Sequence, residues 1–374
     1  MPTFFATASA GTEDLLAGEL RALRAGGVRA GKGGVRFSGS LGTALEACLW
    51  LRTAMRVLMP LKSFEAGSAE ALYEGVRAID WTEHLTARHT FAVDATGTSE
   101  SLRHTHFTAL KVKDAIVDSL REKTGARPSV DARSPDVRVV AHLSRERCDL
   151  SLDLSGEPLF KRGYRVEPTR ASLKETLAAA VLLAAGYDGT RPLHDPMCGS
   201  GTIAIEAALI AKNRAPGLSR PFGVERWPSF DGAKKALFAE LREKARSGER
   251  EAMPLIRASD RDPEAIVVAR VNVARAKLPV ELLELDAREL APLDPPGFVV
   301  ANPPYGERLE AGGKKNLKTF FWQLGQRWRT LSGHRVAVLA GGPEFESAFG
   351  LKPVLRRPLW NGPIACELLV YEPR

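Results

Sequence analysis

The stretch Asn302-Pro303-Pro304-Tyr305 holds the residue types in this 374-residue chain that are best suited to chemistry. It follows an apolar run, Gly297 to Ala301, that predicts a buried strand. Neither proline has an N–H to donate, so the strand must end there and the loop that follows is stiff. An amide side chain, a free backbone carbonyl and an aromatic ring can together hold a planar amino group. The same residues also suit an ordinary strand-ending turn with a packed tyrosine.

A glycine loop between an expected strand and an expected helix is the second candidate site. It reads Asp195-Pro196-Met197-Cys198-Gly199-Ser200-Gly201-Thr202, and the helix begins at Thr202. Gly199 and Gly201 permit a tight turn and a close approach to a ligand, and a helix N-terminus favours negative groups such as a carboxylate. The loop matches part of a dinucleotide fingerprint, but Asp195 would repel a pyrophosphate, and Ser219 stands where that fingerprint expects an acid.

S-adenosylmethionine suits this loop better, because it carries an ammonium and a sulfonium group and no phosphate. Asp260 closes the next strand and can accept from the ribose hydroxyls, and Asp286 closes the third and can accept from the adenine amino group. A single aspartate at a strand end can instead cap a helix, but ligands of open α/β sheets bind at the carboxyl ends of the strands. The expected cofactor-binding residues are Asp195, Pro196, Cys198, Gly199, Ser200, Gly201, Thr202, Asp260, Asp286 and Asn302. The expected catalytic residues are Asn302, Pro303, Pro304 and Tyr305.

These two sites together predict a methyl transfer to an amino group. Hydrogen bonds from the amine to the Asn302 side chain and the Pro303 carbonyl would turn the nitrogen lone pair towards the sulfonium methyl group. Placement and electrostatics would then supply most of the rate, without a metal or a covalent residue. A paired base cannot reach such a pocket, so the target base must be flipped out or single-stranded.

Composition is that of an ordinary globular protein, with 44% hydrophobic and 26% charged residues. Lys and Arg exceed Asp and Glu by 53 − 45 = 8, which is compatible with a nucleic-acid partner. No apolar run is long enough for a membrane span, and the N-terminus lacks the features of a secretion signal, so we expect a cytoplasmic protein.

Four scattered cysteines without a CxxC pair argue against a disulfide framework and a zinc site. His104 and His106 have no further ligands at metal-binding spacing, so no metal is expected. The oligomeric state is open, with a monomer as the default.

The order of the expected elements divides the chain into four parts. Residues 1–65 and 66–160 each predict a small α+β unit, residues 161–171 a linker, and residues 172–374 alternating strands and helices that end in a β-hairpin. A helix is expected from Leu41 to Met55, and another from Ser172 to Ala185, with Ser172 as its cap and Glu175 three residues later. The linker region, Leu159 to Arg165, mixes cations and aromatics, which suits either RNA contacts or packing on a neighbouring domain. An insertion at 213–253 predicts a charged helix, either solvated or beside the mouth of the site.

The motifs taken together resemble a known enzyme family. Residues 172–374 are similar to Rossmann-like class I S-adenosylmethionine-dependent methyltransferases with the amino-methylating NPPY motif, residues 66–165 resemble a THUMP RNA-binding domain, and the start resembles the accompanying ferredoxin-like domain. The stretches similar to bacterial guanine-N2 methyltransferases of large-subunit ribosomal RNA are Asp153-Leu154-Ser155-Gly156, Lys161-Arg162-Gly163-Tyr164-Arg165, Leu173-Lys174-Glu175-Thr176, the Asp195–Thr202 loop, Asn302-Pro303-Pro304-Tyr305-Gly306-Glu307-Arg308-Leu309 and Asn361-Gly362. The resemblance implies a seven-stranded, mostly parallel sheet with a terminal hairpin, a flipped guanine in the Asn302–Tyr305 pocket and an RNA gripped by the N-terminal domains.

Several alternatives stay open at this point. Related THUMP enzymes modify transfer RNA, so the RNA is ribosomal RNA or possibly transfer RNA. Adenine offers the same kind of exocyclic amine, which leaves adenine-N6 methylation as a second activity. An RNA-binding ribosome assembly factor without turnover is a third reading, and a nicotinamide oxidoreductase is a distant fourth.

Overall fold

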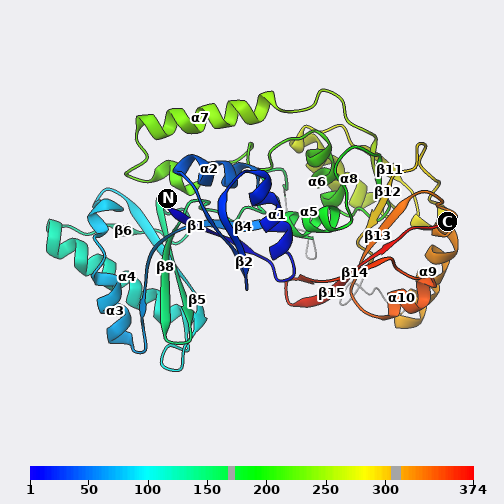
Figure 1. Cartoon of the computed structure of the whole chain (residues 1–374). Coiled ribbons are helices and arrows are strands. Elements are labelled where there is room, and N and C mark those ends of the chain that lie inside the picture. The colour runs from blue at the N-terminus through cyan, green and yellow to red at the C-terminus, as the bar shows by residue number, and fades with distance from the viewer. Residues whose placement is uncertain (167–172, 305–312) are drawn as a thin grey trace.

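The chain folds into an elongated molecule with two halves side by side (Figure 1). The computed structural model describes residues 1–166, 173–304 and 313–374. Among these residues the strands form two sheets, one of eight strands in the N-terminal half and one of seven in the C-terminal half.

One continuous sheet runs through the whole N-terminal half, in the order β2-β3-β1-β4-β8-β7-β5-β6. Its strands are β1 (Thr3–Ala8), β2 (Gly26–Gly31), β3 (Gly34–Ser38), β4 (Ala54–Glu65), β5 (Thr90–Thr98), β6 (Ser129–Val130), β7 (Val137–Ser144) and β8 (Arg147–Asp153). Its helical elements are α1 (Glu13–Ala22), α2 (Leu41–Trp50), α3 (Ala69–Arg77), the 3-10 turn η1 (Trp81–Glu83) and α4 (Thr105–Thr124). Strand β4 pairs with β1 on one side and with β8 on the other, so the two α+β units expected from the sequence share one sheet.

Strand β4 was not predicted, and the helix expected as far as Met55 ends at Trp50 instead. Pro60 lies inside β4, and a proline normally argues against a strand that is paired on both sides. The structure accommodates it at an irregularity, because the register with β8 shifts between Pro60 and Lys62. The long-range pairing of β4, rather than its local sequence, therefore determines this element.

The C-terminal half has the seven-stranded, mostly parallel sheet that the sequence predicted, in the order β11-β10-β9-β12-β13-β15-β14. Five strands are parallel, and β15 and β14 are added antiparallel as the terminal hairpin. The strands are β9 (Leu193–Asp195), β10 (Ile256–Asp260), β11 (Glu281–Glu284), β12 (Phe298–Ala301), β13 (Arg335–Ala340), β14 (Leu355–Asn361) and β15 (Ile364–Tyr371). The helical elements are α5 (Glu175–Ala184), α6 (Thr202–Ala211), η2 (Gly223–Arg226), α7 (Gly232–Ser247), α8 (Pro263–Ala276), η3 (Ala287–Glu289), α9 (Gly313–Trp328) and α10 (Glu344–Phe349).

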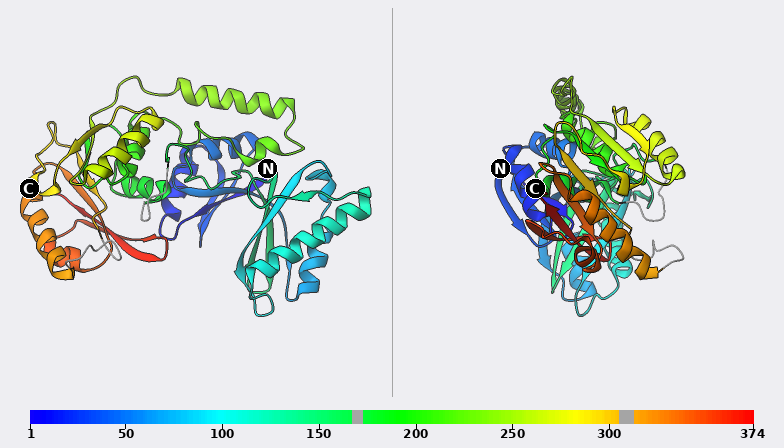
Figure 2. Two further views of the ribbon diagram at one scale, coloured as in Figure 1. Left: turned by 180° about the vertical axis from the view of Figure 1, so that it is seen from behind. Right: turned by 90° about the vertical axis from the view of Figure 1, so that its right-hand side faces the viewer.

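Helices cover both faces of this sheet, and each face has its own core (Figure 2). Side chains of α5, α6 and α8 form one core, and those of α9 and α10 form the other. The predicted start of α5 is wrong in detail. Its N-cap is Lys174, so Glu175 occupies the first helical position and cannot complete a capping box, and Ser172 lies outside the described residues.

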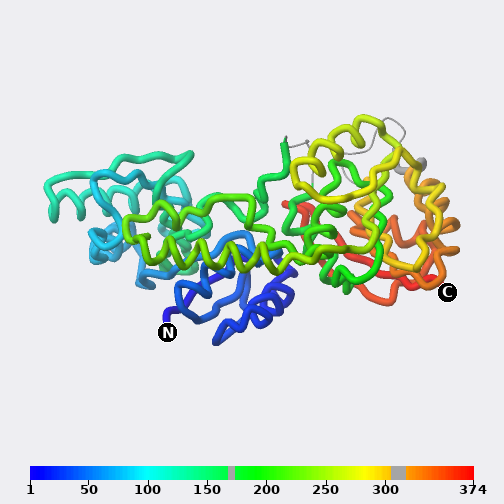
Figure 3. Tube along the Cα trace, turned by 90° about the horizontal axis from the view of Figure 1, so that it is seen from above, coloured from blue at the N-terminus to red at the C-terminus, as the bar shows by residue number. Residues whose placement is uncertain are grey.

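The insertion at 213–253 belongs to the core of the N-terminal half. Helix α7 runs alongside that half in the view from above (Figure 3). Phe222, Trp227, Phe230 and Phe238 join the hydrophobic cluster of residues from β1, α1 and the strands around them. The alternative reading, a helix beside the mouth of the catalytic site, is therefore wrong, because a buried aromatic face fastens the insertion to the other half.

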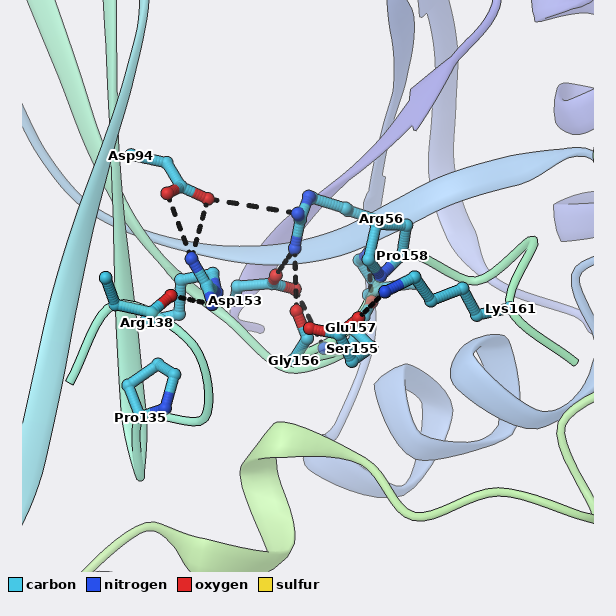
Figure 4. A network of polar contacts seen from close by, with 12 residues as sticks. Arg56, Asp94, Pro135, Arg138, Asp153, Ser155, Gly156, Glu157, Pro158 and Lys161 are labelled. Atoms are coloured by element: carbon cyan, nitrogen blue, oxygen red, sulfur yellow. Dashed lines mark hydrogen bonds and ion pairs between the residues drawn. The ribbon is translucent and has the colours of Figure 1, made fainter. Parts of the chain in front are cut away.

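A polar network lies where the chain leaves strand β8 (Figure 4). Arg56 of β4 forms an ion pair with the fully buried Asp153 and donates to the Gly156 carbonyl at 2.8 Å. From the insertion, Arg220 donates to four carbonyls of the segment that leaves β8, those of Ser155, Glu157, Pro158 and Lys161. One guanidinium thus satisfies a stretch of backbone that has no sheet partner.

The linker residues Arg162 and Tyr164 are buried, with exposed fractions of 3% and 5%. Arg162 donates to the carbonyls of Leu159 and Arg52, and the Tyr164 hydroxyl donates to Glu206 on α6 at 3.2 Å. The reading of these two side chains as RNA contacts is therefore wrong, and the packing alternative holds for them.

Phe238 and its neighbour Leu237 form a matched pair on α7 that tests this attachment. Phe238 is 2% exposed and Leu237 is 37% exposed. We expect Phe238→Ala to lower the free energy of unfolding by about 3–5 kcal/mol, because it leaves a cavity in the N-terminal core. Leu237→Ala should cost less than ~1 kcal/mol. Urea unfolding monitored by tryptophan fluorescence measures both, and equal effects would contradict the assignment of α7 to that core.

Candidate active site

The candidate site lies where the strand order of the C-terminal sheet reverses direction. The chain passes from β9 to β10 on one side and later returns to β12 on the other. Ala258 of β10 pairs with Asp195, and Val299 of β12 pairs with His194, so Asp260 and Asn302 each lie two residues beyond the level of Asp195. Neighbouring strands are about 4.8 Å apart, which separates the backbones of Asp260 and Asn302 by about 10 Å. Such a crevice at a topological switch point is where open α/β sheets bind ligands.

The glycine loop turns sharply between β9 and α6. Gly199 and Gly201 both have positive φ angles, +51° and +82°, which L side chains rarely adopt. A Cβ atom on Gly199 would meet no atom within 4 Å, so the loop is open on that side. On Gly201 it would lie 3.4 Å from the Cβ of Ala269, so this glycine also allows α8 to pack closely.

Asp260 braces this loop from the end of β10. One carboxylate oxygen accepts from the backbone N–H of Gly199 at 2.8 Å, and the other accepts from that of Asp262 at 3.1 Å. Asp262 itself caps α8 by accepting from the N–H of Glu264. The structure thus separates the roles of these two acids, with Asp260 on the loop and Asp262 on the helix.

Asp195 is a buried carboxylate with one unsatisfied oxygen. Its side chain is 1% exposed, and among the residues that the structure describes only the Met197 N–H, 3.3 Å away, donates to Oδ1. Oδ2 has no hydrogen-bond partner among the described residues. Burial raises the pKa of Asp195 well above its ordinary value, and the neighbouring charge of Asp260 adds to the shift. A cation bound at Oδ2 would stabilise the charged carboxylate and so offset the cost of burying it. This is what the predicted contact between Asp195 and a ligand ammonium group requires.

Asn302 presents a second unsatisfied oxygen at the same edge. Its Oδ1 is buried and has no partner within the described ranges. It follows the fully buried strand β12, and Pro303 behind it is buried as well. The predicted stop of the strand before the two prolines is confirmed, whereas Tyr305 lies outside the described residues.

Asp286 has a structural role that the sequence reading had weighed as an alternative. It caps the 3-10 turn η3 by accepting from the N–H of Arg288, and the Arg288 guanidinium donates to both of its oxygens, at 2.9 and 2.6 Å. This pairing lowers the pKa of Asp286. If Asp286 also accepted a hydrogen bond from an adenine amino group, that bond would be added to those that Asp286 already accepts from Arg288.

The four remaining expected cofactor-binding residues form the frame of the loop. Pro196 and Cys198 are buried, and burial raises the pKa of the Cys198 thiol, so that thiol is no nucleophile. Ser200 and Thr202 lie 3.2 Å apart through their hydroxyl oxygens.

Two residues at this loop were missed by sequence reasoning. Arg165 donates to the Thr202 hydroxyl at 3.0 Å, and Asn272 of α8 donates to the Ser200 carbonyl at 2.9 Å. A signal for Asn272 was present, because it continues the spacing of the buried Ile266 and Ala269 along the inner face of α8. A polar residue at such a position needs a buried partner.

The N-terminal half has its own concavity on the face of the eight-stranded sheet. Its volume is about 1150 Å³, and β1, β4, β5, β7 and β8 all contribute to its lining. Three exposed cations on it, Lys32, Arg36 and Lys62, have no ion-pair partner in the part of the chain that the structure describes. The surface therefore combines unpaired positive charge with a hollow that both α+β units build.

Across the described ranges, no group of three or more His, Cys, Asp or Glu side chains is arranged to hold a metal ion. His104 precedes α4 as its N-cap, and His106 lies in the first turn of that helix. No helix in the same ranges combines the length and apolar character needed to cross a bilayer.

The sheet order, the glycine loop and the two buried oxygens define a Rossmann-like methyltransferase class. Comparison with protein families agrees and is more specific. Residues 162–369 match the RMKL-like methyltransferase domain, residues 66–153 the THUMP domain, and residues 3–58 the RlmL ferredoxin-like domain. The chain belongs to this family of RMKL-like methyltransferases with ferredoxin-like and THUMP domains.

Individual relatives support the same assignment. The chain is 44% identical over 382 residues to the ribosomal RNA large subunit methyltransferase K/L of Syntrophotalea carbinolica, covering 99% of this chain and 53% of that one. It therefore spans about half the length of the curated relatives it matches. A crystal structure of SMU.472 complexed with SAH is 31% identical, with a TM-score of 0.89, and covers 100% of this chain and 98% of that one. A predicted N6-adenine-specific DNA methylase from Listeria monocytogenes is 32% identical, with a TM-score of 0.88 and coverages of 100% and 96%.

The burial of Asp195 leads to a prediction about pH. Because its pKa in the free protein is raised, its carboxylate takes up a proton at a higher pH than an exposed aspartate does. The protonated form cannot attract an ammonium group, so the affinity for S-adenosylhomocysteine should fall as the pH drops through that raised pKa. Calorimetric titration at several pH values measures this.

Asp195→Asn is the control, since it should bind more weakly and with a flat pH profile over the same range. An equally flat profile for the wild type would contradict the proposed contact between Asp195 and the cofactor ammonium.

Proposed function

We propose that this protein transfers a methyl group from S-adenosylmethionine to the exocyclic N2 amine of a guanosine in large-subunit ribosomal RNA. The observation that carries the proposal is the pair of buried oxygens, Asp195 Oδ2 and Asn302 Oδ1, which have no donor among the described residues. Buried acceptors without a partner cost free energy, so a ligand that supplies donors to both fits this edge. An ammonium group would satisfy the first and a base amine the second.

The residues that would hold the cofactor are those of the glycine loop, with Asp195 for the ammonium, Asp260 for the ribose and Asp286 for the adenine. The N–H of Gly199 already occupies one lone pair of Asp260, and a carboxylate oxygen can accept more than one hydrogen bond. When bound, S-adenosylmethionine supplies an electrophilic methyl group on a sulfonium. This is the cofactor expected from the sequence, and it agrees with the family and with the SAH complex of SMU.472.

Asn302 and Pro303 would then orient the amine. The Asn302 Oδ1 and the Pro303 carbonyl accept its two N–H bonds, which directs the nitrogen lone pair to one side. The two consecutive prolines, of which Pro303 is buried, restrict the backbone that carries both acceptors, so little reorganisation is needed when the base arrives. The N–C bond would form as the S–CH3 bond breaks, and the methylated amine would then release one proton to solvent. Tyr305 is proposed to stack on the base.

The concave face of the N-terminal sheet is the proposed RNA surface. Its unpaired cations suit phosphates, and the THUMP match supports RNA as the partner. The name of the 44% identical relative supports large-subunit ribosomal RNA over transfer RNA.

Adenine-N6 methylation is the second candidate, and the name of the Listeria relative favours it. The first four residues of the Asn302 motif suit both amines. The likeness of Gly306-Glu307-Arg308-Leu309 to guanine-N2 enzymes favours guanine, although that stretch lies outside the described residues.

Asn302→Ala tests the chemistry. We expect kcat to fall about 10²–10³-fold, because the amine loses its acceptor in the transition state, while the affinity for S-adenosylhomocysteine stays within about twofold. Asp260→Ala should do the reverse and weaken cofactor binding, since it removes the brace of Gly199 as well as the ribose acceptor. Labelled methyl transfer to ribosomal RNA and calorimetry measure the two effects, and nucleoside mass spectrometry of the product identifies the base.

Near-wild-type turnover of Asn302→Ala would contradict the mechanism. N6-methyladenosine in the product would replace the guanine proposal with the second candidate, and RNA binding without any methyl transfer would favour an assembly factor.

The RNA surface is tested separately by charge removal. Replacing Lys32, Arg36 and Lys62 with Gln should weaken RNA binding and reduce the slope of log K against log salt by about 2, if each cation contacts one phosphate of single-stranded RNA. Affinity for S-adenosylhomocysteine should not change. The matched control replaces Arg270, Lys277 and Lys352, three exposed cations outside the concavity, and an equal loss in that variant would show that only overall charge matters.

A further inference from the structure

The segment Tyr164–Val166, which leads from the N-terminal half into the C-terminal half, runs along helix α6 and reaches the glycine loop. Tyr164 contacts Glu206 in the middle of α6, and Arg165 contacts Thr202 at its first residue. The N–H of Val166 donates to the Asn272 side-chain oxygen at 3.1 Å, and the amide of Asn272 donates to the carbonyl of Ser200. Three successive linker residues therefore reach positions 206, 202 and, through Asn272, 200.

These contacts are at least partly buried and are connected to each other. Asn272 is 2% exposed, and the side chain of Arg165 is 16% exposed. The Arg165 guanidinium also donates to the Glu175 side chain and to the Leu173 carbonyl, both at 2.9 Å. These two contacts hold the guanidinium in the position from which it donates to Thr202. The hydroxyl of Thr202 in turn lies 3.2 Å from that of Ser200. Ser200 and Thr202, where the loop leads into α6, are thus both held by contacts with residues outside the loop.

We propose that Arg165 and Asn272 are positioning residues that set the cofactor loop by tying Ser200 and Thr202 to the linker. Neither is assigned to the cofactor, and each acts through a loop residue. Asn272 is suited to this task because its amide has both an acceptor and a donor. The oxygen accepts from the linker, and the NH2 group donates to the cofactor loop. The inference rests on the proposed cofactor but not on the proposed RNA or base.

A general packing role would predict something different. If these residues only stabilised the fold, their loss would lower the unfolding temperature and leave the properly folded fraction with normal cofactor affinity. If they position the loop, the folded variant itself binds cofactor more weakly, because Ser200 and Thr202 lose the contacts that hold them.

The experiment compares Asn272→Asp, Arg165→Met and Arg165→Lys with the wild type. Asn272→Asp keeps the acceptor for Val166 but replaces the donor to Ser200 with a second oxygen. Calorimetric titration with S-adenosylhomocysteine should show about a tenfold higher Kd for Asn272→Asp and Arg165→Met, which corresponds to the loss of one buried hydrogen bond. Arg165→Lys retains the charge and should recover part of the affinity, and kcat at saturating S-adenosylmethionine should change less than KM.

Arg270→Met is the matched control, because Arg270 is exposed on the same helix as Asn272. Unchanged Kd in folded Asn272→Asp and Arg165→Met would overturn the inference, and so would an equal loss of RNA affinity. If Asn272→Asp does not fold, the Met and Lys variants of Arg165 decide the matter. Failure of the proposed function would look different, since wild-type protein would then not bind S-adenosylhomocysteine or would methylate another base while the loop effect remained.

Discussion

Two buried acceptors without a protein donor constrain this structure more than any other feature. Asp195 Oδ2 and Asn302 Oδ1 lie at the carboxyl ends of neighbouring strands, and no described residue donates to either. A fold that only needed stability would place apolar groups there, since leaving such atoms unpaired costs about 1–3 kcal/mol each. The surrounding elements preserve the arrangement instead, with two prolines ending β12 and Asp260 holding the glycine loop open. The free-energy cost of these two unpaired oxygens is explained if bound ligands donate hydrogen bonds to both.

The N-terminal half is attached to the C-terminal half by more than a linker. Strand β4 joins its two units into one sheet, and the insertion from the C-terminal half contributes aromatics to its core. Arg52 of that half also donates to the carbonyls of Leu209 and Arg214, and Arg357 of the terminal hairpin donates to Gly11. An RNA held on the concave sheet face would therefore meet the catalytic edge at a nearly fixed separation, and the flexibility needed to bring a base there would have to come from the RNA.

The parts of the fold that could be predicted are those decided by local chemistry. Two prolines stop β12 wherever it lies in the sheet, and glycines in the loop before α6 permit the positive φ angles of a tight turn. Strand β4 could not be predicted in this way, because Pro60 opposes a strand locally and only pairing with β1 and β8 overrules it. Arg162 and Tyr164 have the composition of an RNA-binding stretch, and their burial follows from Glu206, more than 40 residues away. Of the candidate site, the residues at strand ends were predictable, and the bracing contacts of Arg165 and Asn272 were not, since their partners are brought together only by the packing of α6 and α8.

The connection between linker and cofactor loop also bears on how the two substrates bind. Binding free energies at two sites are linked reciprocally, so any effect of bound RNA on the Tyr164–Val166 segment must return as an equal effect of cofactor on RNA affinity. The segment can transmit such an effect only if it has two arrangements, and its buried neighbours are suited to that. Arg52, Arg162 and Glu206 each have one buried side-chain atom without a hydrogen-bond partner among the described residues. Arg162 and Glu206 already form an ion pair at 3.5 Å, so this cluster combines a charged contact with two donors and an acceptor that no hydrogen bond fixes. The polar joint between the halves is thus a more suitable place for coupling than the apolar cores on either side, whose close packing admits one arrangement.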